Sequence, residues 1–296
     1  MIKRSSLNRI IKMTMFLFIL FILYLFPNKN VYNLKTVKTS TSNYHDIYLL
    51  DKNNYVSKTT ISVKSIEKEK LAIDLLNSLI INGINKNKIP NSFSAVIPEN
   101  TKIQKLKVNN EHVLVSFSND ILKTNNKEKM IESIVYTLTS ISNIKYVNIL
   151  VEDKENYFFK KEYTRDIGIN KKTDISTLND ISRITIYYVS SENNVNYYIP
   201  VTKYINSKDD KVKIIIEELS SKSSYESNLM SYLNYDTKLM SYTLEDSDIN
   251  LYFNDSILNS KKDNKILEEV IYSISYSIKD SIPVSNVHFY VNNKEI

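Results

Sequence analysis

Hydrophobic and polar positions follow one pattern at two places along the chain. In VSFSNDIL (115–122) and in LYFNDSIL (251–258), an alternating apolar run ends in a polar cluster followed by Ile-Leu. The alternation covers Val113, Val115 and Phe117 in one copy, and Ile249, Leu251 and Phe253 in the other. A two-residue period is typical of a strand with one buried face. We therefore expect an equivalent half-buried strand at each place.

The match between the two halves extends well beyond these octets. Residues 47–66 align without gaps on 186–205, 97–117 on 233–253, 129–141 on 265–277, and 146–153 on 286–293. The third pair places Glu132 on Glu268 and Tyr136 on Tyr272. Four segments in the same order, shifted only in polar loops, indicate one unit that occurs twice.

Apolar stripes at helical spacing predict two helices in each copy. Their residues are Leu71, Ala72, Leu75, Leu76, Leu79 and Ile80; Met130, Ile131, Ile134, Val135, Leu138 and Ile141; and Val212, Ile215, Ile216 and Leu219. The segment YSISYSI (272–278) could pass for a strand, but its alignment with the first copy favours a helix. Ser207 with Asp210, and Ser260 with Asp263, have capping-box spacing before the helices of the second copy.

These elements predict an α+β protein with two tandem ββαββαβ-type domains, in which two helices pack on one face of a small sheet. One N-terminal transmembrane helix precedes them. The expected order along the chain is a basic cytoplasmic tail (1–12), a transmembrane signal anchor (13–26), a stalk (27–46), domain one (47–153), a linker (154–185) and domain two (186–293).

The anchor prediction rests on the uncharged run MTMFLFILFILYLF, which follows a leader with four positive side chains. Including Ile10 and Ile11 lengthens the apolar run toward the roughly 20 residues that span a bilayer. A cleaved signal peptide is the alternative, but it requires small residues at the cleavage site, and the first alanine of the chain is Ala72. The positive leader favours an N-terminus inside and a bulk outside the membrane.

The distribution of charge argues against nucleic-acid binding. The net charge is +6, and seven of the 39 basic residues lie within the first 40 positions, which hold no acid. The remainder therefore carries 32 basic and 33 acidic residues, with no basic excess for a phosphate-binding face.

The cysteine and glycine contents restrict the possible chemistry of the chain and the residues that can form its turns. The absence of cysteine excludes disulfides, thiol nucleophiles and a lipidated N-terminal cysteine. Because the chain has only two glycines, its turns must use Asn and Asp, which tolerate a left-handed backbone.

No residue pattern predicts a catalytic, cofactor-binding or metal site. His45, His112 and His288 stand apart from other ligands in the sequence, so structural roles are favoured. DSDIN (246–250) begins like a calcium loop, but Leu251 replaces the required glycine and a strand runs through it. SIEK (65–68) fits Ser-x-x-Lys by chance composition. We therefore expect a protein that is not an enzyme and has no cofactor.

The arrangement resembles a known domain family. IPVTKYI (199–205), the strand entry TKL (237–239), FNDSIL (253–258) and the closing strand VHFYV (287–291) resemble the GerMN domain. Two such domains in tandem behind an anchor are similar to the GerM-like proteins of sporulation and spore germination. The resemblance implies an extracytoplasmic, non-catalytic assembly or scaffold protein between mother cell and forespore or in the cell envelope. Its implied partners are other sporulation envelope or ring-forming proteins, or further copies of the same chain.

Two alternatives remain open from sequence. In one, the tyrosines bind peptidoglycan or another glycan of the envelope; in a weaker one, His288 and Asp255 serve a wall-modifying enzyme. For protein partners, the first place to look is the exposed side of the strand pairs 106–117 and 242–253.

Overall fold

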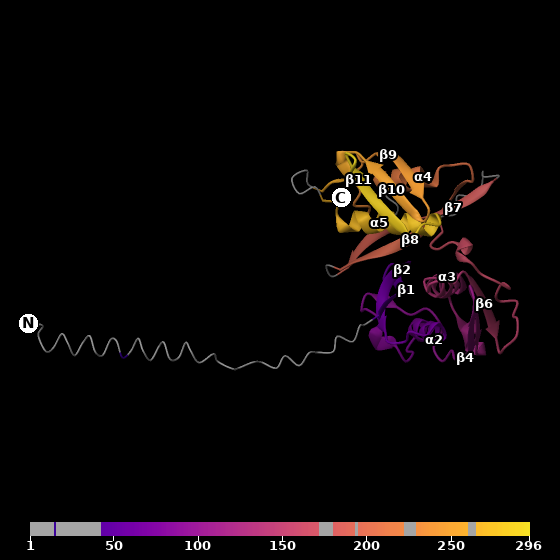
Figure 1. Cartoon of the computed structure of the whole chain (residues 1–296). Coiled ribbons are helices and arrows are strands. Elements are labelled where there is room, and N and C mark those ends of the chain that lie inside the picture. Colours follow the sequence, from indigo (N-terminus) through magenta and orange to yellow (C-terminus); the bar gives the residue numbers. More distant parts are fainter. Residues whose placement is uncertain (1–14, 16–42, 172–179, 193–194, 222–228, 260–264) are drawn as a thin grey trace, which may run out of the picture. The chain divides into compact units, whose positions relative to one another are not determined.

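The computed structural model describes residues 15, 43–171, 180–192, 195–221, 229–259 and 265–296 (Figure 1). The chain divides into Met1–Ser42 and a compact unit, Asn43–Ile296. The predicted tail and anchor lie outside the described residues, apart from Met15. The predicted stalk was too long by four residues, because the first strand begins at Asn43. Within the described residues, no helix has the length and apolar character needed to cross a membrane.

The first copy of the repeat has the predicted order of elements. After a strand hairpin and a helix come a short strand, a second hairpin, a helix and a closing strand. In sequence these are β1 (Asn43–Asp51), β2 (Val56–Val63), α2 (Lys68–Leu79), β3 (Phe93–Ser94), β4 (Ile103–Asn109), β5 (His112–Phe117), α3 (Lys127–Leu138) and β6 (Tyr146–Val151). Short 3₁₀ turns lie at Lys86–Lys88 and Asn119–Lys123.

Over its described residues, the second copy has the same order without the short strand after its first helix, and it ends with one additional strand. It consists of β7 (Ile181–Glu192), β8 (Val195–Asn206), α4 (Lys211–Ser220), β9 (Leu239–Glu245), β10 (Asp248–Phe253), a 3₁₀ turn (Asp255–Ile257), α5 (Glu268–Ser281), β11 (Asn286–Val291) and β12 (Lys294–Glu295). The segment 272–278 is therefore helical, as the alignment predicted. We call 43–153 the first repeat, 154–171 the connecting segment and 180–296 the second repeat.

The prediction of one small sheet in each repeat was wrong. The first hairpin and the later strands belong to different sheets, with the orders β3-β1-β2-β8-β7, β4-β5-β6 and β12-β11-β10-β9. In the first repeat α3 contacts β1 and α2 contacts β4, whereas in the second α4 and α5 both contact β7 and α5 also contacts β11. The alternation of apolar residues marks a buried face but does not state which strands pair.

Within each later sheet, two strands run parallel around the second helix. β5 pairs with β6 from His112↔Tyr146 onward, and β10 pairs with β11 from Asp248↔Asn286 onward. A parallel pair requires a crossover connection, and α3 and α5 supply it.

The predicted helical stripes form the two hydrophobic cores. Every residue of the three stripes is buried, with the stripes of α2 and α3 in one cluster and that of α4 in the other. The cluster of the second repeat also takes Val270, Ile274 and Ile278 from α5. Burial of these aliphatic side chains is the main force that orders each repeat.

The alignment of the second helices was wrong by one turn. Burial and contacts pair α3 with α5 at a shift of 140, so that Ile134 and Ile274 are both fully buried. Backbone N–H groups of β1 and β7 donate to equivalent helix hydroxyls, Tyr48 N to Thr137 Oγ1 (3.0 Å) and Tyr187 N to Ser277 Oγ (2.9 Å). Tyr136 therefore corresponds to Tyr276 and not to Tyr272. A four-residue slip leaves a helical stripe nearly unchanged, so the pattern could not reveal it.

The ungapped alignment of the first hairpins was also wrong. Tyr48 pairs with Lys58, ten residues on, whereas its counterpart Tyr187 pairs with Pro200, thirteen residues on. The hairpin of the second repeat is thus three residues longer, and the counterpart of Pro200 is Lys58. Loops at hairpin ends tolerate such insertions.

The segment predicted as a linker is structured over its described part. Phe159 and Tyr163 are buried in the core of the first repeat, and a 3₁₀ turn spans Arg165–Ile167. The strand β7 begins at Ile181, inside the predicted linker. The connecting segment is therefore part of the folded unit.

The capping prediction for α4 was wrong in its residue. Asp210 is the N-cap, and its side chain accepts a hydrogen bond from Lys213 N, so Ser207 lies outside the helix. Asp accepts this bond as well as Ser does, which makes both positions plausible from sequence. The Ser260–Asp263 pair lies outside the described residues.

The predicted use of Asn and Asp in turns is confirmed. Among the described non-glycine residues with positive φ, all but Glu152 are Asn or Asp: Asn54, Asn82, Asn100, Asn110, Asn143, Asp153, Asn170, Asp246, Asn292 and Asn293. These side chains lower the cost of the left-handed backbone that glycine would otherwise supply.

Candidate functional site

The two repeats meet through equivalent edge strands. β2 and β8 pair antiparallel at Lys58↔Tyr198 and join the two hairpins into one five-stranded sheet (Figure 1). Nearby, the hydroxyls of Tyr48 and its counterpart Tyr187 lie 3.1 Å apart. Contacts between equivalent residues on antiparallel equivalent strands define an approximate two-fold axis, as in an isologous dimer.

Asn170 continues the strand ladder where it would otherwise stop. In the register of Lys58↔Tyr198, the next pair would be Val56 with Pro200, and proline has no N–H to donate. Asn170 Oδ1 accepts from Val56 N (2.9 Å), and its Nδ2 donates to Val56 O (2.8 Å) and to Pro200 O (2.8 Å). The side-chain amide of Asn170 therefore takes the place of a backbone amide and links the two repeats by hydrogen bonds.

Neighbouring residues hold Asn170 in this position. Its backbone is left-handed, with φ 46°, and its N–H donates to the buried carboxylate of Glu132 (3.2 Å). Lys129 Nζ donates to Asn170 Oδ1 (2.6 Å) and lies 3.6 Å from Glu132. Burial raises the pKa of Glu132, and Lys129 opposes this effect.

The same segment also pairs with β8. Ile169 N donates to Thr202 Oγ1 (2.9 Å), and Thr202 N donates to Ile169 O (2.9 Å). The connecting segment is thus hydrogen-bonded to both repeats.

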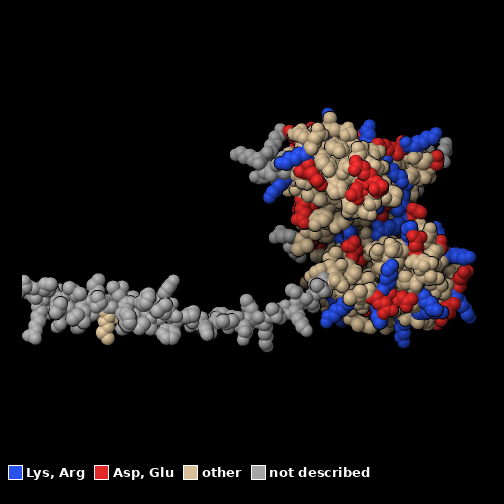
Figure 2. Space-filling view, viewed as in Figure 1, with Lys and Arg blue, Asp and Glu red and all other residues tan. Residues whose placement is uncertain are grey.

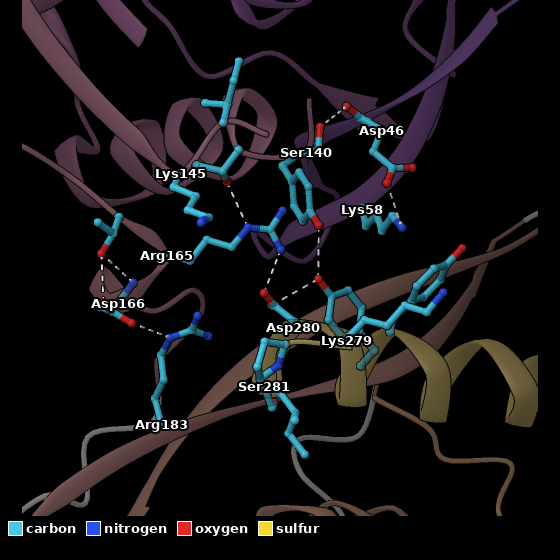
Figure 3. Close-up of a pocket in the computed structure, with 18 of the residues that line it drawn as sticks. Asp46, Lys58, Ser140, Lys145, Arg165, Asp166, Arg183, Lys279, Asp280 and Ser281 are labelled. Atoms are coloured by element: carbon cyan, nitrogen blue, oxygen red, sulfur yellow. Dashed lines mark hydrogen bonds and ion pairs between the residues drawn. The ribbon is translucent and has the colours of Figure 1, made fainter. Parts of the chain in front are cut away.

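A buried ion pair lies on the other side of the junction (Figure 3). Arg165 Nη1 is 2.7 Å from Asp280 Oδ1, and the two side chains are 22% and 5% exposed. Arg165 also donates from Nε to Thr139 Oγ1 (2.9 Å), and its guanidinium lies over the ring of Tyr136. Arg165 comes from the connecting segment, Asp280 from α5 and Thr139 from the end of α3. One guanidinium therefore joins all three parts of the unit.

The electrostatics of this cluster follow from burial and from the arginines. Burial alone would raise the pKa of Asp280, but Arg165 and Arg183 more than offset it, so the pKa lies below its usual value. Burial raises the pKa of Tyr48 to about 12, against the attraction of Arg165. Burial, and next the nearby carboxylate of Asp280, also raise the pKa of Tyr187. The carboxylate is therefore ionised and both tyrosines are protonated at neutral pH.

A cleft of about 690 Å³ opens beside the ion pair. Lys58 lies at its wall, 3.0 Å from Asp46 and 3.5 Å above the ring of Tyr276. Burial lowers the pKa of Lys58, and Asp46 partly restores it. Arg183 Nε is 3.1 Å from Asp166 on the opposite side of the cleft (Figure 3). Residues of both repeats and of the connecting segment thus line the cleft.

The histidines considered from sequence do not come together. His45 lies in β1, His112 stacks on Tyr146 in the first repeat, and His288 lies between Asp248 (3.6 Å) and Glu295 (2.9 Å) on the second. Asp255 instead accepts a hydrogen bond from Asn292 Nδ2 (2.9 Å). Over the described residues, no group of three or more potential ligands could hold a metal ion.

The sequence places this fold in a known family. A family profile described as "Germane: Sporulation and spore germination" matches residues 46–157 and again residues 185–296. The chain therefore belongs to this family of sporulation and germination proteins, with two GerMN-type domains in tandem, which confirms the resemblance inferred from sequence.

Two relatives support this assignment along most of the chain. The "Spore germination protein GerM" of Bacillus subtilis (strain 168) is 30% identical over 274 residues, covering 88% of this chain and 74% of the relative. The solved structure of the "Tandem GerMN domains of the sporulation protein GerM from Bacillus subtilis" aligns with a TM-score of 0.76 and 28% identity, covering 85% of this chain and 92% of that one. The tandem arrangement as a whole is therefore shared.

Sequence reasoning missed the residues that join the repeats. Arg165 and Asn170 lie in the predicted linker and have no counterpart in the repeat, so internal comparison could not find them. The signal available was the apolar run of Phe158, Phe159, Tyr163 and Ile167 within this charged stretch. Such spacing indicates a packed segment in preference to a free linker.

Replacement of Asn170 by Ala should weaken the junction. The change leaves the N–H of Val56 and two carbonyl oxygens without their partners, so we expect the free energy of unfolding to fall by about 2–4 kcal/mol. Asn110→Ala is the matched control, because Asn110 has a similar left-handed φ of 52° but is exposed. Equal losses in the two variants, measured by chemical denaturation, would mean that the bridge contributes nothing beyond backbone strain.

Asp280→Asn should destabilise the protein in a pH-dependent way. At neutral pH the change leaves Arg165 buried without a charged partner, which costs about 3–5 kcal/mol. Because the folded pKa of Asp280 lies below its usual value of 3.8, its ionisation stabilises the fold above that value. This contribution disappears as the pH falls through the folded pKa. Denaturation curves of wild type and variant should therefore converge in acid, with the exposed Asp236→Asn as control; a constant difference down to pH about 2 would refute the assignment.

Proposed function

We propose that the chain is a non-catalytic assembly protein, anchored in the membrane with its folded unit outside the cytoplasm, that acts in sporulation or spore germination. The observation that carries this proposal is the tandem family match along one folded unit. The described residues offer interfaces and charge pairs, and no nucleophile lies beside an oriented base. Two repeats fixed relative to each other suit a protein that presents several surfaces at defined spacing.

The anchor part of the proposal rests on sequence. The uncharged run 13–26 follows Lys3, Arg4, Arg9 and Lys12, and this order favours insertion with the N-terminus inside. The folded unit would then begin about 16 residues beyond the apolar run, at Asn43.

Free sheet edges supply surfaces for protein partners. β4 and β9 are edge strands of their sheets, and they belong to the strand pairs singled out from sequence. On β9, Met240 and Leu244 are exposed. Exposed edges and apolar side chains favour addition of a further strand or a packed partner. Other sporulation envelope proteins and further copies of this chain are the partners we propose.

Complementation of a gene deletion tests this function. The deletion strain should fail in spore morphogenesis or germination, and the full-length gene should restore it. A version lacking residues 1–40 should be released from membrane fractions and should not restore it. Normal heat-resistant spores with normal germination in the deletion strain would overturn the proposal, and rescue by the shortened version would remove the anchor from it.

A further inference from the structure

β4 and β9 are equivalent strands at the edges of the two later sheets. Each leads into a two-residue turn. The two residues that close such a turn bond each other, and closely bonded pairs alternate with widely spaced ones along an antiparallel ladder. The residue before the closing one, Val108 in β4 and Leu244 in β9, therefore directs its N–H and C=O away from the sheet. Outward groups of this kind can bond a further strand.

The first repeat closes this edge with its own side chains. Val108 N donates to Glu69 Oε1 at the start of α2 (3.0 Å), and α2 contacts β4. The exposed side chains of β4 include Lys105 and Lys107. Lysines on an edge strand oppose the approach of a second strand. The edge of β4 is therefore protected.

The second repeat uses the carboxylate that corresponds to Glu69 in another way. The buried pairs Leu75–Leu76 of α2 and Ile215–Ile216 of α4 are equivalent, which places Asp209 at the position of Glu69. Asp209 accepts a hydrogen bond from Asn206 N (3.1 Å) at the end of β8. This protection is therefore directed at β8 and not at β9.

The side chains of β9 also leave its edge open. Ser241 and Thr243 stand at the positions of Lys105 and Lys107, since the two hairpins have the same register. Leu244 is 55% exposed. Over the described residues, no strand pairs with the outer side of β9 (Figure 1). In the same view the surface of the second repeat is mostly uncharged, shown in tan in Figure 2.

The charges at the two ends of β9 favour one direction of pairing. Lys238 precedes the strand, whereas Glu245 and Asp246 lie at its other end, and all three are exposed. When two such strands run antiparallel, Lys238 of each lies toward the acidic end of the other. A parallel arrangement would bring like charges together. The strand is therefore complementary to a second copy of itself.

We propose that β9 pairs antiparallel with β9 of a second copy of this chain, around a two-fold axis at Thr243. In this register Tyr242 of each copy exchanges backbone hydrogen bonds with Leu244 of the other, and the exposed Leu244 side chain packs beside the half-buried Tyr242 ring. The two four-stranded sheets then form one sheet. The contact is isologous, so association stops at a dimer. The chain already joins its own repeats by antiparallel edge strands, β2 and β8.

This inference rests on the proposed assembly role, because it specifies a second copy as the partner and β9 as the surface. One strand from each copy makes a smaller contact than the roughly 1,600 Å² of a standard interface. We therefore expect a weak dimer in dilute solution. Tethering of both copies to one membrane raises their effective concentration and reinforces the contact.

Disulfide crosslinking of the full-length protein in phosphatidylcholine vesicles tests the pairing. Because the chain has no cysteine, Thr243→Cys introduces a single thiol. The proposed axis places the two Cα atoms of this position about 4.5 Å apart, a spacing that a disulfide can bridge. Mild oxidation should convert most of the chain to a covalent dimer. Lys107→Cys, at the equivalent position of β4, is the matched control and should give about tenfold less dimer.

A second substitution tests whether the open edge causes the association. Leu244→Lys in the Thr243→Cys chain adds the kind of charge that protects β4, and it should lower the dimer yield about tenfold. Ile84→Lys, at an exposed apolar residue of the first repeat, should leave the yield unchanged. Thermal unfolding of each variant shows whether it is folded. Sedimentation of the cysteine-free chain in density-matched detergent should show a monomer–dimer equilibrium that Leu244→Lys shifts to monomer.

Other results would overturn the proposal. Equal crosslinking of the two cysteine variants, or a yield that a folded Leu244→Lys chain retains, would show that β9 is not the contact. Crosslinking of Thr243→Cys in sporulating cells to a different protein, with no second copy, would assign the edge to another partner. A monomeric chain whose deletion still blocks spore formation would remove the dimer alone. A dimer in a strain that sporulates normally without the gene would remove the assembly role and leave the pairing.

Discussion

Pro200 cannot donate a backbone hydrogen bond, and this constraint decides how the two repeats are joined. A continuous ladder between β2 and β8 would need that donor beside Val56. The protein supplies it from a side chain, since the carboxamide of Asn170 bonds both Val56 and Pro200. Because Asn170 lies in the connecting segment, the same bond fixes the path of that segment. The position of Arg165, five residues earlier, follows from it.

The two repeats therefore differ from each other close to the approximate two-fold axis that relates them. Tyr48 and Tyr187 still meet as equivalents, and each packs against an equivalent helix tyrosine, Tyr136 or Tyr276. Asp280, in contrast, occupies the position that Ser140 has in the first repeat, and it forms an ion pair with Arg165. A buried ion pair adds little net stability compared with an apolar contact, but it penalises arrangements that separate the charges. We interpret the pair as a device for specificity: it selects one relative position of the repeats.

The sequence patterns predicted the secondary-structure elements and their buried faces, which depend on periodicity. They did not predict which strands pair or how the two repeats align residue by residue. The strands, most of the helices and their buried faces followed from apolar spacing, and the helix at 272–278 followed from alignment with the first copy. The one-turn slip between α3 and α5 could not be seen, because a helical stripe shifted by one turn looks nearly the same. The longer hairpin at Pro200 could not be seen either, because an insertion at a hairpin end leaves the alternation of its strands intact. The division into separate sheets depends on contacts between distant strands. Arg165 and Asn170 were missed because they act outside the repeat, in a segment whose charge is typical of a loop.

The central claim is that the two repeats form one rigid unit held by Asn170 and Arg165. Because the chain has no cysteine, Ile84→Cys and Tyr235→Cys introduce two unique sites for spin labels, one in each repeat, and both positions are exposed. Pulsed electron–electron double resonance should give a single narrow distance distribution between the two labels when the junction residues are unchanged. Adding Asn170→Ala and Asp280→Asn should broaden it markedly. A broad distribution before these changes, or an unchanged narrow one after them, would contradict the account.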